Sequence, residues 1–256
     1  MKAAIIVLIL MGLTLGLLNK SRADDFAAHN LVEGNNAFAL DLYQRLNSKG
    51  KNIFLSPYSI SSAFSMCYAG ARGNTKKEMS KVFHYPEDQE QLHKNFAEIN
   101  SALEKIQKKC HVELNIANSL WAQNDYSFLL EYFSIIKKYY GAKIDNVDFE
   151  HNPEKARKEI NDWTEEKTNH LIEEIIPQGV LTPLTKLVLA SAIYFKGEWL
   201  STFESERTKD EPFWVTPERS KNVPMMRQDG YFEYAEDRDI QALLLPYKGN
   251  DLSMVI

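Results

Sequence analysis

The chain has 256 residues, of which 44% are hydrophobic and 25% are charged, and its formal net charge is −5. This is an ordinary globular composition, long enough for one large domain or two small ones. The acidic balance argues against general affinity for nucleic acid or for an anionic membrane surface.

The first residues have the pattern of a secretory signal peptide. Lys2 precedes an apolar and small-residue run over 3–18, and small residues stand at Ser21 and Ala23. This pattern predicts a signal peptide over residues 1–23 and a secreted, extracellular mature chain. The run is short for a membrane span, so we favour cleavage over an uncleaved anchor. Cleavage leaves 27 basic and 35 acidic residues, a net charge of −8.

The first half of the chain has the patterns of helices. Ser56-Pro57 predicts an N-cap followed by proline at the first helical position, opening a helix that ends at Gly70. Thr75 and Glu78 have capping-box spacing and predict the start of a short helix through Val82. Further helices are expected over residues 38–46 ending at Lys49-Gly50, over 92–106 with apolar steps of four and three, over 128–140 ending at Gly141, and from Asn152-Pro153 onward.

Strands are interleaved with these helices and then dominate. Apolar and polar residues alternate from Val112 to Ile116, which predicts a half-exposed strand. The uncharged run Leu187–Phe195 predicts a strand covered on both sides. Helices first and strands later indicate an α+β fold with antiparallel or mixed sheets. The chain stops at Ile256 inside an apolar run, so we expect a truncated domain. Shorter strands are expected over 213–215, 231–234, 240–245 and 252–256.

The sequence carries no pattern of catalytic, cofactor or metal chemistry. The six histidines include no HExxH pair and no zinc-site spacing, and Cys110-His111 are adjacent, which prevents the facing geometry of a nucleophile and its base. No nucleophile elbow, P-loop or dinucleotide fingerprint is present. We therefore expect no enzyme, no cofactor and no metal. Cys67, expected on a buried helix, and Cys110 are interpreted as two reduced thiols rather than one disulfide.

One basic cluster is a weak candidate for a polyanion such as a glycosaminoglycan. Lys105, Lys108 and Lys109 lie near the end of the predicted fourth helix. Nearby glutamates such as Glu104 dilute their charge, and lysines at a helix C-terminus also complement its dipole. We therefore favour an ordinary solvated helix end over a binding site.

Several motifs in a fixed order resemble one family, the serpins. Residues 52–60, Asn-Ile-Phe-Leu-Ser-Pro-Tyr-Ser-Ile, are similar to the serpin signature NxxxSPxSI, and Tyr68-Ala-Gly-Ala-Arg-Gly-Asn-Thr follows as it does in serpins. The matches span nearly the whole mature chain. The other matching segments are Asn118–Trp121, Tyr139–Ala142, Val147–Phe149, Ile160–Trp163, Glu166–Asn169, Ala192–Trp199 and Val223–Met226.

The resemblance implies a multi-helix domain with three β-sheets over residues 24–256, with the reactive loop and its P1 residue beyond Ile256. It implies a protein that is monomeric when complete and inhibits a serine protease, or in some cases a cysteine protease. The cleaved loop inserts as a new strand in the main sheet and disables the protease. Two alternatives stay open, namely a non-inhibitory serpin-fold carrier, chaperone or storage protein, and an inactive fragment.

The resemblance also assigns residues to positions. Ser56 and Ser59 match a polar cluster under the main sheet, the shutter, and the family's shutter asparagine falls at Ser191 here. Serine offers one donor where an amide offers two, so this network must be rearranged or filled by water. Trp199 matches the tryptophan of the breach, where loop insertion begins. Each residue also has a plain capping or packing interpretation. Supporting motif positions are Asn52, Pro57, Asn161, Trp163, Phe195 and Gly197.

Overall fold

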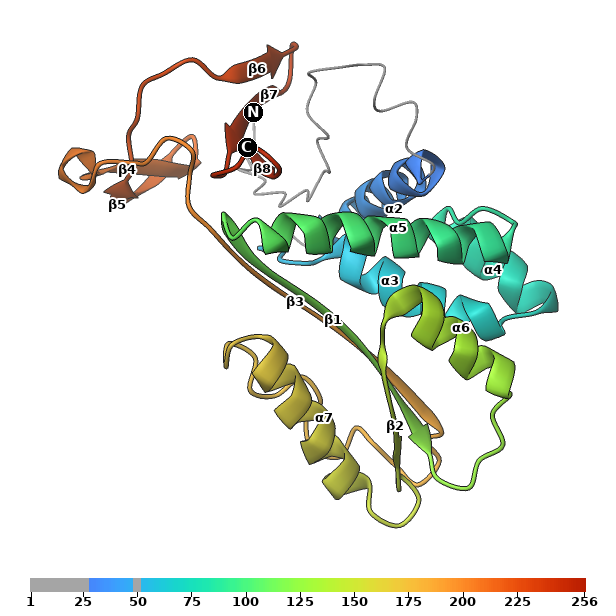
Figure 1. The fold of residues 1–256 in the computed structure, drawn as a ribbon. Coiled ribbons are helices and arrows are strands. Elements are labelled where there is room, and N and C mark those ends of the chain that lie inside the picture. Colours follow the sequence, from blue (N-terminus) through green and yellow to red (C-terminus); the bar gives the residue numbers. More distant parts are fainter. Residues whose placement is uncertain (1–27, 48–51) are drawn as a thin grey trace. The chain divides into compact units, whose positions relative to one another are not determined.

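The computed structural model describes residues 28–47 and 52–256 (Figure 1). The predicted signal peptide and the predicted helix end at Lys49-Gly50 lie outside these residues. The described chain forms two compact units, a larger one that runs to Phe195 and a smaller one made of 109–112 and 196–256. Within the described ranges, no helix is both long enough and apolar enough to span a bilayer.

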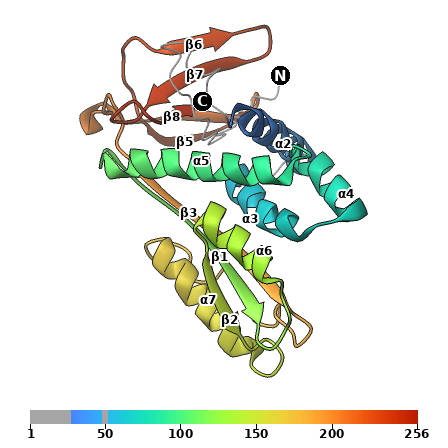
Figure 2. The same ribbon diagram turned by 45° about the vertical axis from the view of Figure 1, so that its right-hand side comes forward.

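The larger unit consists of helices packed on both faces of a sheet. The sheet has the strand order β2-β1-β3, and β1 runs parallel to β2. Helix α7 lies on one face, and α3, α5 and α6 lie on the other (Figures 1 and 2). The bounds are α2 His29–Asn47, α3 Pro57–Gly70, α4 Gly73–Phe83, α5 Gln89–Lys108, β1 Val112–Gln123, α6 Leu130–Tyr140, β2 Lys143–Val147, α7 Pro153–Lys167 and β3 Leu187–Gly197.

Local capping chemistry decides where several helices begin and end. Helix α3 begins at Pro57 and ends at Gly70 as predicted. Helix α6 ends where predicted because Gly141 adopts a left-handed conformation with φ 57°. The predicted capping box of α4 is wrong. The helix begins at Gly73, and the Glu78 carboxylate accepts from Asn74 Nδ2 at 2.8 Å.

Two apolar clusters hold the larger unit together. Between α7 and the sheet, the rings of Trp121 and Trp163 meet edge to face, 6.4 Å apart at 78°. Phe149, Ile160 and the buried alanines of β3 complete this cluster. On the other face the helices share a cluster of aromatic rings. Its main members are Phe38, Phe64, Tyr68, Phe83, Tyr85, Phe96 and Tyr140.

The burial of two segments differs from the sequence expectation. Strand β3 was expected to be covered on both sides, yet only Ala190 and Ala192 are buried along it. It lies at one end of the strand order, so β1 is its only neighbouring strand within the described residues. Cys67 is exposed rather than buried because it lies on the outer side of α3. The structure contains Cys67 and Cys110 as thiols, not as a disulfide.

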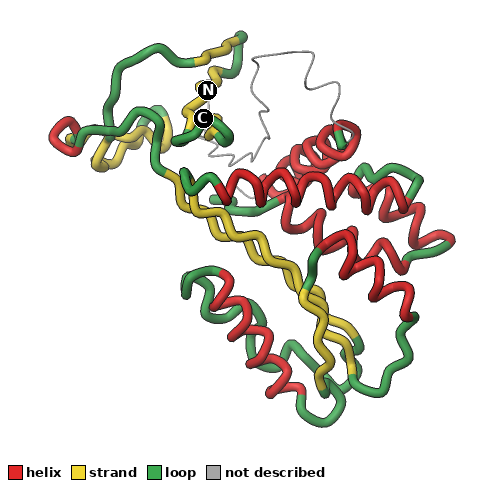
Figure 3. The backbone as a smooth tube through the Cα atoms, viewed as in Figure 1, coloured by secondary structure: helices red, strands yellow, loops and turns green. Residues whose placement is uncertain are grey.

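The smaller unit is built of antiparallel strands. A hairpin pairs β4 with β5, and a second sheet has the order β6-β7-β8 (Figure 3). With the sheet of the larger unit, the described chain holds three sheets, one with a parallel pair and two antiparallel, which confirms the α+β expectation. Strand β6 starts two residues later than predicted. The bounds are a short 3₁₀ turn Ser205–Arg207, β4 Lys209–Thr216, β5 Arg219–Met225, β6 Glu233–Glu236, β7 Gln241–Pro246 and β8 Ser253–Val255.

Candidate functional site: the polar layer beneath the sheet

The first turn of α3 is fixed by Ser56. Its hydroxyl accepts a hydrogen bond from the backbone N–H of Ser59 at 3.2 Å, and Pro57 occupies the first helical turn. Ser56 and Ser59 are half-buried, whereas Asn52 at the start of the motif is exposed. The structure therefore gives Ser56 the capping role that serine commonly has at a helix start.

Further along α3, three fully buried serines form a polar layer. The Ser62 hydroxyl donates to Asn118 Oδ1 on β1 at 3.5 Å, and the Ser65 hydroxyl donates to the Ser62 carbonyl at 2.7 Å. The Tyr85 hydroxyl donates to the Ser61 carbonyl at 2.5 Å. Buried polar groups need such partners, and the bond from Ser62 joins α3 to β1.

The sequence interpretation did not identify these three serines, although their spacing could have indicated them. Ser61, Ser62 and Ser65 are spaced so that all three lie on one side of a helix, within an otherwise apolar segment. A line of hydroxyls on the buried side of a helix indicates a polar contact inside the core.

Ser191 on β3 has no such partner. Its hydroxyl oxygen is buried, and no hydrogen bond reaches it from the described residues, Ser56 and Ser59 included. Its neighbours Ala190 and Ala192 pack in the α7 cluster, so Ser191 is turned to the opposite face of the sheet. An unsatisfied buried hydroxyl costs about 1–3 kcal/mol.

In the smaller unit, Trp199 is held by ring stacking and backbone pairing together. Its ring stacks on Tyr247 with centroids 4.5 Å apart and planes at 11°, and Phe203 approaches edge-on at 6.1 Å. A backbone bridge joins Trp199 to Tyr247, and the Lys248 N–H donates to the Glu198 carbonyl at 2.8 Å. Trp199 is thereby fixed against the end of β7.

Two supporting positions on α7 have definite structural roles, since Trp163 packs on Trp121 and Asn161 fastens the segment after the helix. The side-chain oxygen of Asn161 accepts from the N–H groups of Ile175 at 3.1 Å and Ile176 at 2.9 Å. Its Nδ2 donates to the Ile176 carbonyl at 3.0 Å. The remaining supporting positions, Phe195 and Gly197, are half-buried near the end of β3.

The basic cluster is partly neutralised within the protein. Lys105 and Lys108 lie in the last turn of α5, and the Nζ of the next residue, Lys109, is 2.6 Å from Asp251 Oδ1. This ion pair lowers the positive charge that a polyanion would meet. In the part of the chain that the structure describes, no group of three His, Cys, Asp or Glu side chains is arranged to hold a metal ion.

One buried titratable group lies in the helical layer. The side chain of His93 on α5 places Nδ1 2.7 Å from the Tyr140 hydroxyl. Burial lowers the pKa of His93 to about 4, and it raises the pKa of Tyr140. At neutral pH both groups are uncharged, so a neutral hydrogen bond joins the imidazole and the hydroxyl.

Comparisons with known proteins give one result. A family model described as Serpin (serine protease inhibitor) matches residues 33–256. An uncharacterized serpin-like protein of Thermococcus kodakarensis is 42% identical over 88% of this chain and 52% of its own length. Human Serpin B4 is 41% identical over 89% of this chain and 63% of its own length. The leukocyte elastase inhibitor of Sus scrofa is 43% identical over 88% of this chain and 60% of its own length.

The fold comparison agrees with the sequence comparison. A structure of emu (Dromaius novaehollandiae) ovalbumin aligns with a TM-score of 0.83 at 33% identity, covering 89% of this chain and 62% of that one. A structure titled Cleaved Serpin 42Da aligns with a TM-score of 0.83 at 34% identity, covering 90% and 62%. The chain thus spans between about half and just under two thirds of the length of these proteins.

Proposed function

The chain belongs to the serpin family, and from this premise we propose that the whole protein is a protease inhibitor that acts as a suicide substrate. A serine protease cleaves its reactive loop, and the loop then adds a strand to the sheet beside β3. The described residues supply the sheet and the helices that support it. The hydrolytic chemistry belongs to the protease.

The position of β3 carries this proposal. One edge of this strand faces β1, and the other edge meets no strand among the described residues. A free strand edge offers backbone N–H and C=O groups that can pair with a further strand. Apart from Ala190 and Ala192, the apolar side chains from Leu187 to Phe195 are only half-buried. An added strand would therefore bury more apolar surface as well as pairing the edge.

A non-inhibitory carrier, chaperone or storage role is the second candidate. One observation favours it, namely that the Ser191 hydroxyl makes no bond that would hold the sheet in one arrangement.

The natural full-length protein, incubated with pancreatic elastase or trypsin, tests the proposal. Elastase is chosen because one relative is named leukocyte elastase inhibitor. The proposal expects a protease–protein complex that survives boiling in SDS, and none with protease whose catalytic serine has been blocked. Cleavage of the protein without a stable complex would contradict inhibition and support the second candidate.

Secretion is a separate proposal that rests on the sequence of residues 1–23. Expression in eukaryotic cells followed by N-terminal sequencing of the medium tests it. We expect a mature protein that begins at Asp24. Retention in the cell with Met1 or Lys2 at the N-terminus would contradict secretion.

A further inference from the structure

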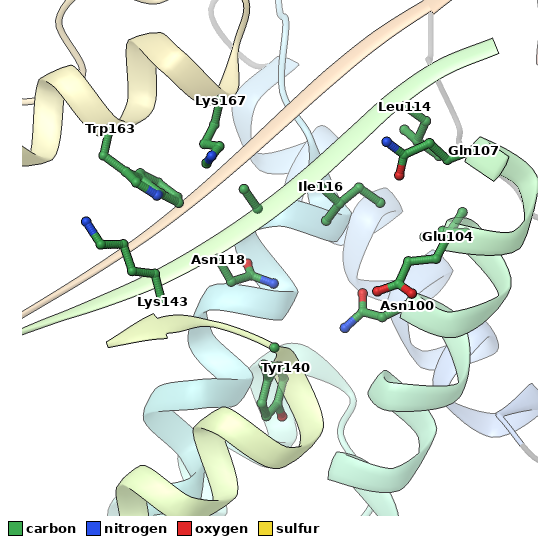
Figure 4. A pocket seen from close by; sticks show the side chains of 13 residues that line it. Asn100, Glu104, Gln107, Leu114, Ile116, Asn118, Tyr140, Lys143, Trp163 and Lys167 are labelled. Atoms are coloured by element: carbon green, nitrogen blue, oxygen red, sulfur yellow. The ribbon is translucent and has the colours of Figure 1, made fainter. Parts of the chain in front are cut away.

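A cavity of about 300 Å³ lies where β1 and β2 end and β3 begins, at the lower end of the sheet in Figure 1. All of its lining residues belong to the larger unit. It is separate from the cavity in Figure 4, which lies further back along β1 and is also lined by residues of α5 and α7. The lining consists of residues 123–126 at and after the end of β1, of Asp148, Glu150 and His151 in the turn before α7, and of Lys186.

Hydrogen bonds tie the segments around this cavity together. The backbone N–H of Gln123 donates to the Lys186 carbonyl at 2.9 Å. The side-chain oxygen of Gln123 accepts from the N–H groups of Phe149 at 2.7 Å and Glu150 at 3.1 Å. The end of β1 is thus fixed both to the start of β3 and to the turn before α7. A lining that is already ordered loses little conformational entropy when a ligand binds.

One hydrogen-bond donor in the lining has no acceptor. Gln123 is 6% exposed, and its side-chain nitrogen, Nε2, makes no hydrogen bond within the described residues. Because the side-chain oxygen is turned to the N–H groups of Phe149 and Glu150, Nε2 is the end that faces the cavity. An amide nitrogen only donates, so it fits an acceptor oxygen such as a ligand carbonyl. A donor in a buried side chain gains most from such a partner.

The charged groups of the lining leave an excess of negative charge. Asp125, Asp148 and Glu150 each contribute a carboxylate, and Lys186 Nζ lies 3.2 Å from Glu150 Oε2. Among the described residues, no lysine or arginine pairs with Asp125 or Asp148. These two uncompensated carboxylates favour a ligand that carries positive charge.

Hydrogen bonds hold Asp148 in its charged form. The backbone N–H of His151 donates to Asp148 Oδ1 at 2.9 Å, and Asn152 Nδ2 donates to Oδ2 at 2.8 Å. The His151 ring nitrogen Nδ1 is also 3.2 Å from Oδ1. These bonds lower the pKa of Asp148 to about 2, so this carboxylate is ionised at neutral pH.

An organic cation fits this lining better than a metal ion. Within residues 28–47 and 52–256, no three His, Cys, Asp or Glu side chains are grouped to hold a metal. A guanidinium is planar and carries several N–H donors, so it can donate to two carboxylates at once. The cavity volume is at the lower end of the range for ligand sites, which suits a single amino-acid residue.

We propose that this cavity binds an arginine residue in an extended peptide segment of a partner protein. The guanidinium donates to the carboxylates of Asp125 and Asp148, and the carbonyl of the same arginine accepts from Gln123 Nε2. This site is separate from the proposed strand addition beside β3, and its existence does not depend on inhibitory activity.

Calorimetric titration of the natural full-length protein with Nα-acetyl-arginine N-methylamide tests the site. We expect one saturable site with a Kd on the order of 1 mM or below at low salt. The citrulline analogue has nearly the same shape without the charge, so it should bind about tenfold more weakly. N-Acetylagmatine keeps the guanidinium but lacks the arginine carbonyl, so it leaves Gln123 Nε2 without an acceptor and should bind about threefold more weakly.

Two variants with the same change of charge separate the cavity from the rest of the acidic surface. Asp125→Asn removes one carboxylate and suits the backbone, because φ at this position is 60° and asparagine tolerates that region. Its affinity for the arginine probe should fall about tenfold. Asp162→Asn removes an exposed carboxylate of α7 that does not line the cavity, so it should bind as the unchanged protein does. Thermal unfolding shows whether each variant is folded, and bound probe should raise the midpoint.

Absence of saturable binding up to about 10 mM would overturn the proposal, and so would equal affinity for the arginine and citrulline probes. Equal affinity of folded Asp125→Asn and Asp162→Asn for the arginine probe would also overturn it. The comparison of arginine with citrulline uses the unchanged protein, so it decides even if Asp125→Asn does not fold.

Discussion

Strands β1 and β3 lie side by side in one sheet, and their burial is the reverse of what their sequences suggest. β1 carries glutamate, asparagine, serine and glutamine, yet its residues from Asn118 to Gln123 are all buried. β3 carries an unbroken apolar run, yet only Ala190 and Ala192 are buried. β1 has a neighbour on each side along its second half, and β3 has one. Within the described residues, the strand with two neighbours is the more buried of the two.

The polar side chains of the two strands differ in the same way. On β1, Ser119 accepts from Trp121 Nε1 at 2.9 Å, and Gln123 Oε1 accepts from the Phe149 N–H at 2.7 Å. On β3, the hydroxyl of Ser191 is buried without a partner. Within the described residues, these polar side chains of β1 therefore have partners, whereas the hydroxyl of Ser191 on β3 has none.

The largest expected effect is the loss of stability when one apolar side chain of each strand is truncated to alanine. Trp121→Ala removes a ring that is 1% exposed and packed on Trp163, so the free energy of unfolding should fall by about 3–5 kcal/mol. Ile193→Ala on β3 removes a half-buried side chain and should cost about 1 kcal/mol. Urea unfolding of both variants measures the difference. Equal losses of unfolding free energy in the two variants would contradict the difference in burial between β1 and β3.

The second effect is a pH dependence in the helical layer on the α3 side of the sheet. The pKa of His93 is about 4 when folded and about 6.5 when unfolded, so the unfolded state takes up the proton first. The stability that the neutral imidazole contributes is complete above pH ~6.5 and is lost as the pH falls to ~4, a change of about 3 kcal/mol at most.

Chemical unfolding of the unchanged protein and of His93→Gln across this range isolates the His93 contribution. Their difference should change with pH between about 6.5 and 4 and be flat above. A His93→Gln profile parallel to that of the unchanged protein would contradict this, because it would mean that the pKa of His93 is the same in the folded and unfolded states.

A matched pair of serine variants tests whether the hydroxyls of β1 and β3 differ in hydrogen bonding. Ser119→Ala leaves the indole N–H of Trp121 without its acceptor and should lower the free energy of unfolding by about 1–2 kcal/mol. Ser191→Ala removes a hydroxyl that has no partner and should raise it by about 1 kcal/mol. Denaturant midpoints give both signs. A loss of stability in Ser191→Ala would mean that this hydroxyl is bonded after all.

The smallest effect is expected at the ion pair of Lys109 and Asp251 in the smaller unit. The Lys109 side chain is 52% exposed, so water and salt weaken the attraction. Asp251→Asn should change the free energy of unfolding by less than about 0.5 kcal/mol, and high salt should reduce the change further. A loss above 1 kcal/mol would place this pair among the buried contacts rather than on the surface.

Features determined by neighbouring residues in the sequence could be predicted. Pro57 and Gly141 set helix boundaries through their own backbone preferences, and both boundaries are confirmed. The short strands β2 and β5 were missed because they are polar and gain their strand form from a partner. The over-estimated burial of β3 has the same origin, since a sequence does not show how many strands flank a given one.

In the candidate site, too, contacts between residues close in the sequence could be predicted and contacts between distant residues could not. The capping role of Ser56 was readable because it involves a residue three positions away. The bond between Ser62 and Asn118 joins residues 56 positions apart in the sequence. Such features arise only from packing. The missing partner at Ser191 was not predicted, because it also depends on how distant segments pack.

Hydrogen exchange of the natural full-length protein, before and after cleavage by elastase or trypsin, tests strand addition beside β3 most directly. The account predicts that amides of Leu187–Gly197 exchange more slowly after cleavage, because a new strand pairs with the free edge. Amides of Ser119–Gln123, which already have neighbours on both sides, should change little. Unchanged exchange along β3 after complete cleavage would contradict the account.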